Sequence, residues 1–228
     1  MDKIIIKDWI LPKSKARSGK KLRRFSGVTI HETANEAQGA TAKNHAVYMN
    51  LNGGKNAECS YHYVVDEQET YHLLPDNEVA WHAGDGAEGK GNNETIALEI
   101  CVNREGNFAR AVSNAAVLTA CLLYENGVHT ARAMVFTHRD FSPWKKDCPH
   151  NLLAGKAGGM AQFITAVQTA LDVLWNDALQ PPDVATPSVP QKLYKVQVGA
   201  FSSESAARAY AEKVRKAGFD SFLVDAKR

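Results

Sequence analysis

Two potential metal ligands and a lysine lie close together in one short stretch of the sequence. The stretch, residues 137 to 153, reads THRDFSPWKKDCPHNLL and contains His138, Lys146 and Cys148. Imidazole nitrogen and thiolate sulfur are the donors that Zn²⁺ prefers, so a metal site is the first hypothesis. A catalytic zinc has three protein ligands and keeps a fourth position for water. The stretch supplies two, so a third donor must come from elsewhere in the fold.

Two predicted strands end on histidines. Residues 25 to 31, FSGVTIH, form a β-branched run typical of a buried strand, and it ends on His31. Residues 133 to 137, AMVFT, form a second short strand that delivers His138 to the edge of the sheet. His31 therefore occupies a strand end, where functional sites form.

A carboxylate interrupts another apolar strand. Residues 95 to 102 follow a loop rich in Gly and Asn, and Glu99 lies there between Leu98 and Ile100. Burying a carboxylate is costly unless a cation or a proton-transfer task accompanies it. Period-two alternation would equally place Glu99 on a solvated sheet face. The pattern alone leaves both interpretations open.

Residues 60 to 66 and 70 to 74 flank a polar turn and predict an antiparallel hairpin. Its alternation places Tyr61 and Tyr63 on one face and His62 on the other. His62 follows Cys59 by three positions, which makes a Cys/His metal pair conceivable. No second pair follows at zinc-finger spacing, which disfavours that interpretation.

Helical patterns occupy much of the remaining first part of the chain. Residues 40 to 54 predict a helix in which His45 is an ordinary helix residue. Ser113 is a candidate N-cap for a helix that ends near Gly127 and buries Cys121. Apolar residues from Met160 onward recur at helical spacing and predict a helix to about residue 179. We expect that helix to close a first domain of residues 1 to 177.

Four prolines mark residues 178 to 192 as an extended linker. Residues 193 to 228 then read as strand, helix and strand, with serines before the helix and a glycine after it. One such βαβ-like unit leaves strand edges open, so we expect it to be stable through pairing. A homodimer through residues 191 to 228 is therefore expected. The fold class is α/β, a mixed sheet flanked by helices with this small unit appended.

Composition excludes several classes of protein. The 228 residues carry 27 basic and 25 acidic side chains, a net charge of +2, which gives no general attraction to nucleic acid or membranes. The local exception is a basic run over residues 13 to 24, for which a solvated loop is the simpler interpretation and a polyanion contact the alternative. No apolar run suits a membrane span or a signal peptide, and four irregularly spaced cysteines fit reduced thiols. We expect synthesis in the cytoplasm.

Several motifs together resemble one known family. VTIHETAN, SYHYVVD, AWHAGDG, IALEICVN and FTHRDFSPWKKDCPH are similar, in this order, to the zinc-dependent N-acetylmuramoyl-L-alanine amidases of the phage-lysozyme-like class, over residues 25 to 175. The resemblance implies a mixed sheet flanked by helices and one Zn²⁺ held by His31, His138 and Cys148. It also implies Glu99 as general base and Lys146 as the group that steadies the oxyanion.

The same resemblance assigns lesser roles to other residues. Tyr61 matches a tyrosine that assists catalysis in some branches and is retained as a candidate helper. Trp81 and His82 match the substrate cleft, with loop packing as the alternative, and His150 is expected to be a structural residue behind the metal.

The implied substrate is the bond between N-acetylmuramic acid and L-alanine in bacterial peptidoglycan. An endolysin that reaches the cell wall after release from the cytoplasm fits this reading. The sequence VQVGAFSSESAARAYAEKVRKAGF resembles part of a sporulation-related repeat that binds glycan strands. Three alternatives remain: a non-catalytic peptidoglycan-recognition module of the same fold, a structural zinc protein, and a nucleic-acid-binding protein that uses the basic run.

Overall fold

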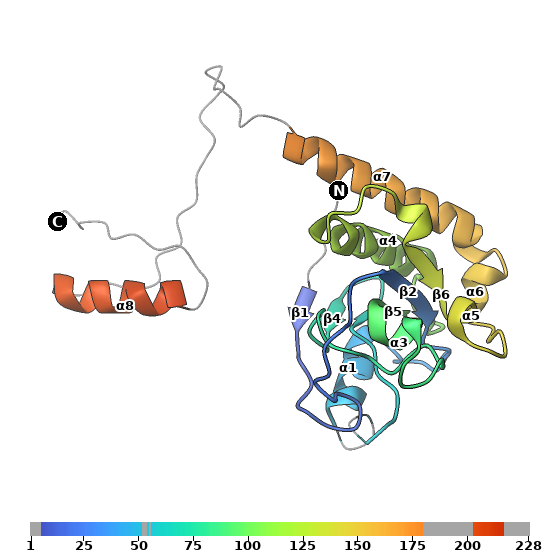
Figure 1. The fold of residues 1–228 in the computed structure, drawn as a ribbon, viewed down its shortest axis with the longest axis horizontal. Coiled ribbons are helices and arrows are strands. Elements are labelled where there is room, and N and C mark those ends of the chain that lie inside the picture. The colour runs from blue at the N-terminus through green and yellow to red at the C-terminus, as the bar shows by residue number, and fades with distance from the viewer. Residues whose placement is uncertain (1–5, 52–53, 55, 180–202, 217–228) are drawn as a thin grey trace. The chain divides into compact units, whose positions relative to one another are not determined.

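The computed structural model describes residues 6–51, 54, 56–179 and 203–216. Contacts divide the chain into two compact units, Met1–Pro181 and Pro182–Arg228. The described part of the first unit contains a sheet and the helices around it, and that of the second contains helix α8, Glu204–Lys216 (Figure 1).

A mixed six-stranded sheet forms the centre of the first unit, with strand order β1-β4-β3-β5-β2-β6. Only β3 and β4 pair antiparallel, which confirms the predicted hairpin, and the other neighbours are parallel. The neighbouring interior strands β5 and β2 are nearly all buried, which their β-branched and aliphatic residues favour. The strands are β1 (Ile6–Asp8), β2 (Gly27–Glu32), β3 (Tyr63–Val65), β4 (Thr70–His72), β5 (Thr95–Ile100) and β6 (Val135–Thr137).

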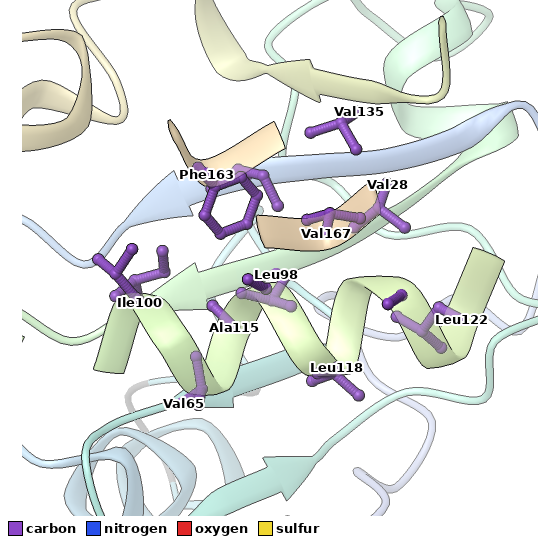
Figure 2. Close-up of a cluster of buried hydrophobic side chains, with 14 of the residues drawn as sticks. Val28, Val65, Leu98, Ile100, Ala115, Leu118, Leu122, Val135, Phe163 and Val167 are labelled. Atoms are coloured by element: carbon purple, nitrogen blue, oxygen red, sulfur yellow. The ribbon is translucent and has the colours of Figure 1, made fainter. Parts of the chain in front are cut away.

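Helices cover both faces of this sheet. Helices α4 (Phe108–Glu125) and α7 (Gly159–Leu179) bury the larger core against one face, where Phe163 and Val167 lie over β2 and β5 (Figure 2). Helix α1 (Ala42–Asn50) and the N-terminal segment bury a smaller core against the other face. Short elements complete the unit: α3 (Lys90–Glu94), α5 (His138–Phe141), α6 (His150–Leu153), and the 3₁₀ turns Ala131–Ala133 and Lys156–Gly158.

The predicted fold class is thus confirmed, and two local predictions are wrong. Helix α4 begins after Asn107, whose side chain accepts the Arg110 backbone N–H at 3.0 Å, so Ser113 lies inside the helix. Tyr61 packs against the smaller core while Tyr63 belongs to the larger one, so the two tyrosines do not share a face.

The reason for the second difference is His62. The Nδ1 atom of His62 accepts the backbone N–H of Ala97 in β5 at 2.9 Å. The His62 side chain thus takes the place of the backbone carbonyl that would normally accept this N–H in a regular strand pair. The regular strand therefore starts only at Tyr63, and the alternation predicted from residue 60 onward fails.

The basic run of residues 13 to 24 is a largely exposed loop, as the simpler interpretation predicted, and most of its basic side chains also pair with acidic ones. Glu78 and Glu94, 5% and 6% exposed, lie at the centre of these pairs. Acidic neighbours therefore partly balance the charge of a segment that stays exposed to solvent. The pairs join Lys15 to Glu58, Arg17 and Lys21 to Glu78, Lys20 to Glu88, Arg23 to Glu88 and Glu94, and Arg24 to Glu94.

In the second unit, α8 confirms the predicted helix, and the Ser203 Oγ accepts the Ala206 N–H at 3.3 Å as a cap. The proline linker and the two strands predicted around α8 lie outside the described residues. None of the helices in the described ranges combines the length and apolar character needed to cross a membrane.

Candidate metal centre

His31 and His138 meet because their strands are neighbours. Strands β2 and β6 are parallel, and Ile30 is opposite Thr137, so the residues that follow, His31 and His138, emerge side by side. His138 is the first residue of α5, and Cys148 precedes α6 at the same edge of the sheet (Figure 1). All three side chains are buried, at 2%, 6% and 8% exposed.

The three donor atoms lie within 4.8 Å of one another, and two of their separations are close to those of a zinc site. The Nδ1 atoms of His31 and His138 are 3.1 Å apart, and the Cys148 Sγ is 3.7 Å from His31 Nδ1. In a tetrahedral zinc site, bonds of about 2.1 Å to nitrogen and about 2.3 Å to sulfur place these atoms roughly 3.4 Å and roughly 3.6 Å apart. The set is the only such cluster of His, Cys, Asp or Glu found among the described residues. The residues therefore fit the metal that the sequence predicted.

The cysteine segment is anchored by Glu32, the last residue of β2. Its buried carboxylate accepts the backbone N–H groups of Asn151 and Leu152 at 2.9 and 3.0 Å and the Asn151 side-chain amide at 2.8 Å. These donors belong to α6, directly after Cys148. Glu32 thus ties the segment that carries one ligand to the strand that carries another.

A second set of contacts fixes the start of α5. The Thr137 N–H and hydroxyl both donate to Asp140, at 2.7 and 2.8 Å, in a capping box. Asp147 pairs with Arg139 and, at 2.6 Å, with His150 Nδ1. The His150 side chain is 64% exposed, so it contacts Asp147 at the surface instead of competing for the metal.

Burial sets the protonation of the three ligands. It lowers the pKa of His31 well below the usual value and that of His138 to about 4, and nearby positive charge from Lys146 acts in the same direction. Both imidazoles are therefore neutral at pH 7, as a metal requires. Burial raises the pKa of the Cys148 thiol to about 12, so this group must lose a proton when it binds a cation.

Glu99 lies beside the ligands on the next strand. It is directly opposite His31 in the parallel β2–β5 pair, so both side chains leave the same face of the sheet. Burial raises the pKa of Glu99 to about 8, opposed by Lys146 and reinforced by Glu32. Its Oε2 is buried with no hydrogen-bond partner in the described part of the protein. An unpartnered carboxylate here favours the catalytic interpretation over the solvated one.

Lys146 is exposed, and its positive charge lowers the pKa of His31, of His138 and of Glu99. The preceding Lys145 has φ +53°, a left-handed conformation uncommon for a residue with a side chain. The backbone N–H groups of Lys145 and Lys146 both donate to Ser142, at 3.0 and 3.4 Å. This turn carries the lysine close to the ligands.

The predicted auxiliary residues occupy three different environments. Tyr61 is partly buried, and burial together with the Glu99 charge raises its pKa well above the usual value. Trp81 is partly exposed, and its backbone pairs with Ser60. His82 is 8% exposed and contacts His31 at 3.0 Å. Both ring nitrogens of His82 contact protein atoms, which favours the alternative of loop packing over a substrate contact for this residue.

Sequence reasoning missed Trp144 and the place of Cys59. A Cβ added to Gly84 would lie 3.4 Å from the Trp144 ring and 3.5 Å from His138 Nε2, so the indole is next to the ligand, yet it is 68% exposed. Cys59 is exposed; partial burial raises its pKa, and the charge of Glu99 acts in the same direction while that of Lys146 opposes it, so Cys59 lies near both of these residues. The aromatic-rich loop motif around Trp144 was the available signal.

The remaining histidines are structural. His62 bonds Ala97 N through one ring nitrogen and the Glu78 carbonyl through the other, both at 2.9 Å, so a Cys59/His62 metal pair is ruled out. His129 stacks on Trp175 at 4.0 Å. The others, His45 and His72, lie in α1 and β4.

Comparison with known proteins gives two family matches. The family described as N-acetylmuramoyl-L-alanine amidase matches residues 21–151, and the SPOR domain matches residues 184–228. N-acetylmuramoyl-L-alanine amidase CwlH of Bacillus subtilis is 43% identical over 126 residues, 55% of this chain and 48% of CwlH. XlyA of the same organism is 40% identical over 148 residues, 62% of this chain and 47% of XlyA. The chain thus spans about half the length of these curated relatives.

Solved structures agree with these matches. The catalytic domain of XlyA superposes with a TM-score of 0.64 at 36% identity, covering 72% of this chain and 99% of that domain. PlyL gives a TM-score of 0.63 at 30% identity, covering 73% of this chain and 99% of its own.

Proposed function

Because the chain belongs to the N-acetylmuramoyl-L-alanine amidase family, we propose that it hydrolyses the amide bond between N-acetylmuramic acid and L-alanine in bacterial peptidoglycan. The proposal includes one Zn²⁺ held by His31, His138 and Cys148. The observation that carries it is Glu99, opposite His31, whose Oε2 atom is buried with no hydrogen-bond partner in the described residues and which lies beside the clustered donor atoms of His31, His138 and Cys148.

Bound zinc would polarise a carbonyl and lower the pKa of a coordinated water to ~7. Glu99 is suited to take the proton of the attacking water, because a pKa near the working pH lets one group accept and return a proton. The protonated Glu99 then passes the proton to the leaving amine of L-alanine. A base fixed one strand away from a ligand needs no rearrangement to do so.

Lys146 supplies a positive charge where the carbonyl oxygen becomes negative. Its ammonium already acts on Glu99 and on both histidine ligands, which supports its place at the reacting centre. Lys146→Ala should lower turnover with zinc retained. Tyr61 lies close enough to Glu99 for that charge to raise its pKa, and we propose it as a helper only.

Trp144 and Trp81 are the proposed substrate contacts. An exposed indole beside His138 offers an apolar face on which a sugar ring or peptide can pack, and leaving it in water is otherwise unfavourable. His82 is left out of this set because it is buried behind His31.

Two alternatives lose support from the same geometry. A non-catalytic recognition module has no need for a carboxylate with a buried, unpartnered oxygen beside three candidate metal donors. A structural zinc site would close the fourth position with a protein ligand, and the candidate for that, His150, pairs with Asp147 at the surface.

The SPOR match supports a cell-wall role for the second unit. We propose residues 1–177 as the catalytic domain, 178–192 as a linker and 193–228 as a wall-binding or dimerisation element. The proposed target, peptidoglycan, is the same for both parts.

The test is digestion of purified peptidoglycan followed by mass spectrometry of the new ends. New L-alanine amino termini, released by the wild type and not by Glu99→Gln, are the expected result. New reducing sugar ends would identify a glycosidase and overturn the proposal, as would intact peptidoglycan after incubation with zinc-loaded protein.

A further inference from the structure

His82 forms a buried link between a metal ligand and the backbone. Its Nδ1 is 3.0 Å from His31 Nε2, and its own Nε2 is 3.1 Å from the carbonyl oxygen of Gly91. The two imidazole rings meet edge to face, with centroids 5.1 Å apart and an interplanar angle of 84°. The chain of atoms therefore runs from Gly91 O through His82 to His31, and His31 Nδ1 faces the other two donors.

The direction of these hydrogen bonds follows from the acceptor at one end. A backbone carbonyl can only accept, so the contact with Gly91 O requires a proton on His82 Nε2. A neutral His82 then has a lone pair on Nδ1, which must accept the proton of His31 Nε2. Neutral His31 consequently has a lone pair on Nδ1, the atom that faces His138 and Cys148.

The link is held rigidly. The Asn92 side-chain oxygen accepts the backbone N–H groups of His82 and Ala83, both at 2.8 Å. Asn92 is fixed in turn by Asp85, which accepts its backbone N–H at 3.3 Å, and by Gly86, whose carbonyl accepts its side-chain amide at 3.0 Å. The backbone that carries the His82 ring is therefore tied to α3 by Asn92, and the ring itself by its contact with Gly91 O.

His138 has no equivalent support. Its Nε2 is buried without a hydrogen-bond partner in the described residues. Hydrogen bonds thus fix the tautomer of His31, whereas no such contact fixes that of His138 in the described residues.

We infer that His82 is a positioning residue that fixes His31 as the Nε2–H tautomer and so presents the His31 Nδ1 lone pair to the metal. The inference rests on the metal site of the proposed function. It concerns the orientation of a ligand and assigns His82 no contact with substrate.

The experiment compares His82→Phe with His82→Asn in the full chain. Phenylalanine fills the space but cannot accept the His31 proton, whereas an asparagine side chain can place an acceptor near the position of Nδ1. Zinc affinity is measured by competition with a chelator. Loss of a group that supports a metal ligand typically costs about 10- to 100-fold in affinity, so we expect that loss in His82→Phe and a clearly smaller one in His82→Asn.

His62→Phe is the matched control, because His62 is also buried and also bonds protein atoms through both ring nitrogens, without touching a ligand. It should lower the unfolding temperature with little change in zinc affinity. Equal zinc affinity in wild type and His82→Phe, or an equal loss in His62→Phe, would overturn the inference.

A second measurement needs no substitution. Long-range ¹H–¹⁵N NMR spectra of the metal-free wild type distinguish the histidine tautomers directly. We expect Nε2–H for both His31 and His82, and an Nδ1–H tautomer at His31 refutes the inference. This readout is independent of hydrolysis, so a failure of the amidase assay and a failure of the His82 inference are distinguishable.

Discussion

Glu32 offers the sharpest test of how the cysteine ligand is held in place. Its carboxylate accepts three hydrogen bonds from Asn151 and Leu152, and it is 6% exposed. A buried donor left without a partner costs about 1–3 kcal/mol. Glu32→Gln keeps one oxygen acceptor but turns an amide N–H₂ group toward N–H donors. Because part of the network survives, we expect a destabilisation of about 2–4 kcal/mol.

That loss has two measurable effects. For a protein of this size about 1 kcal/mol corresponds to about 2–4 °C, so the thermal unfolding midpoint should fall by roughly 4–16 °C. If the segment that bears Cys148 opens locally, zinc affinity also falls, by tenfold for each ~1.4 kcal/mol once the open form predominates. Calorimetric unfolding and chelator competition measure the two effects separately.

Asp66→Asn is the matched control for Glu32→Gln. The Asp66 carboxylate is also buried and accepts three backbone N–H groups, from Ala42, Gln68 and Glu69, at 2.9, 2.8 and 2.7 Å. None of these donors lies on a segment that bears a ligand. The control should lower the unfolding midpoint with zinc affinity unchanged. The reasoning is refuted if Glu32→Gln leaves zinc affinity unchanged, or if Asp66→Asn lowers it equally.

Four further outcomes are expected. The Cys148 thiol, with a pKa of about 12, should release about one proton on binding zinc, so zinc affinity should rise about tenfold per pH unit between about pH 6 and 9. Calorimetry in buffers of different ionisation enthalpy measures the number of protons released. A zinc affinity that does not change with pH would contradict this prediction. Glu99→Gln should retain zinc and lose ~10²- to 10⁴-fold in turnover, and near wild-type hydrolysis would make Glu99 structural. Burial lowers the pKa of His72, but Asp76 and Asp8 outweigh it and raise the pKa overall, so protonated His72 stabilises the fold fully below the usual value of 6.5 and this stabilisation is lost as pH rises through the raised pKa. Asp8→Asn should therefore lower the unfolding midpoint at about pH 5.5 and not at about pH 9. An equal shift of the midpoint at both pH values would be contrary evidence. Deleting residues 180–228 should preserve hydrolysis of a soluble muropeptide, lower wall retention and convert any dimer to a monomer, whereas unchanged mass and retention in sedimentation and pull-down assays would leave the segment without that role.

Strand patterns indicated the positions of two of the clustered residues, whereas the set of His31, His138 and Cys148 came from the family resemblance. A buried β-branched run ends at His31 and a short apolar run ends at His138, so periodicity alone placed both at a sheet edge. The register that sets Glu99 opposite His31 was not readable, because nothing local states which strands become neighbours. The choice between a solvated and a catalytic Glu99 depended on that register.

The supporting residues were not predictable for the same reason. Glu32 reads as one more polar residue after a strand, and its partners are at positions 151 and 152. His82 stands in a loop motif beside Trp81, where a substrate contact is the natural interpretation, and only the packed structure shows its ring against His31. Asn107 and Ser113 are both good caps, so local sequence could not decide where α4 begins.

The parallel pairing of β2 with β5 makes the spacing of ligand and base a property of the backbone. Ile30 and Leu98 are opposite one another on the core face, just as His31 and Glu99 are on the other. A slip by one residue would exchange Glu99 for an aliphatic side chain and bury a carboxylate in the core at the same time. The packing of the core and the spacing between the proposed ligand and the proposed base therefore depend on the same register. The loops, the appended unit and the surface charge of the protein could therefore change while the spacing between His31 and Glu99 stayed the same.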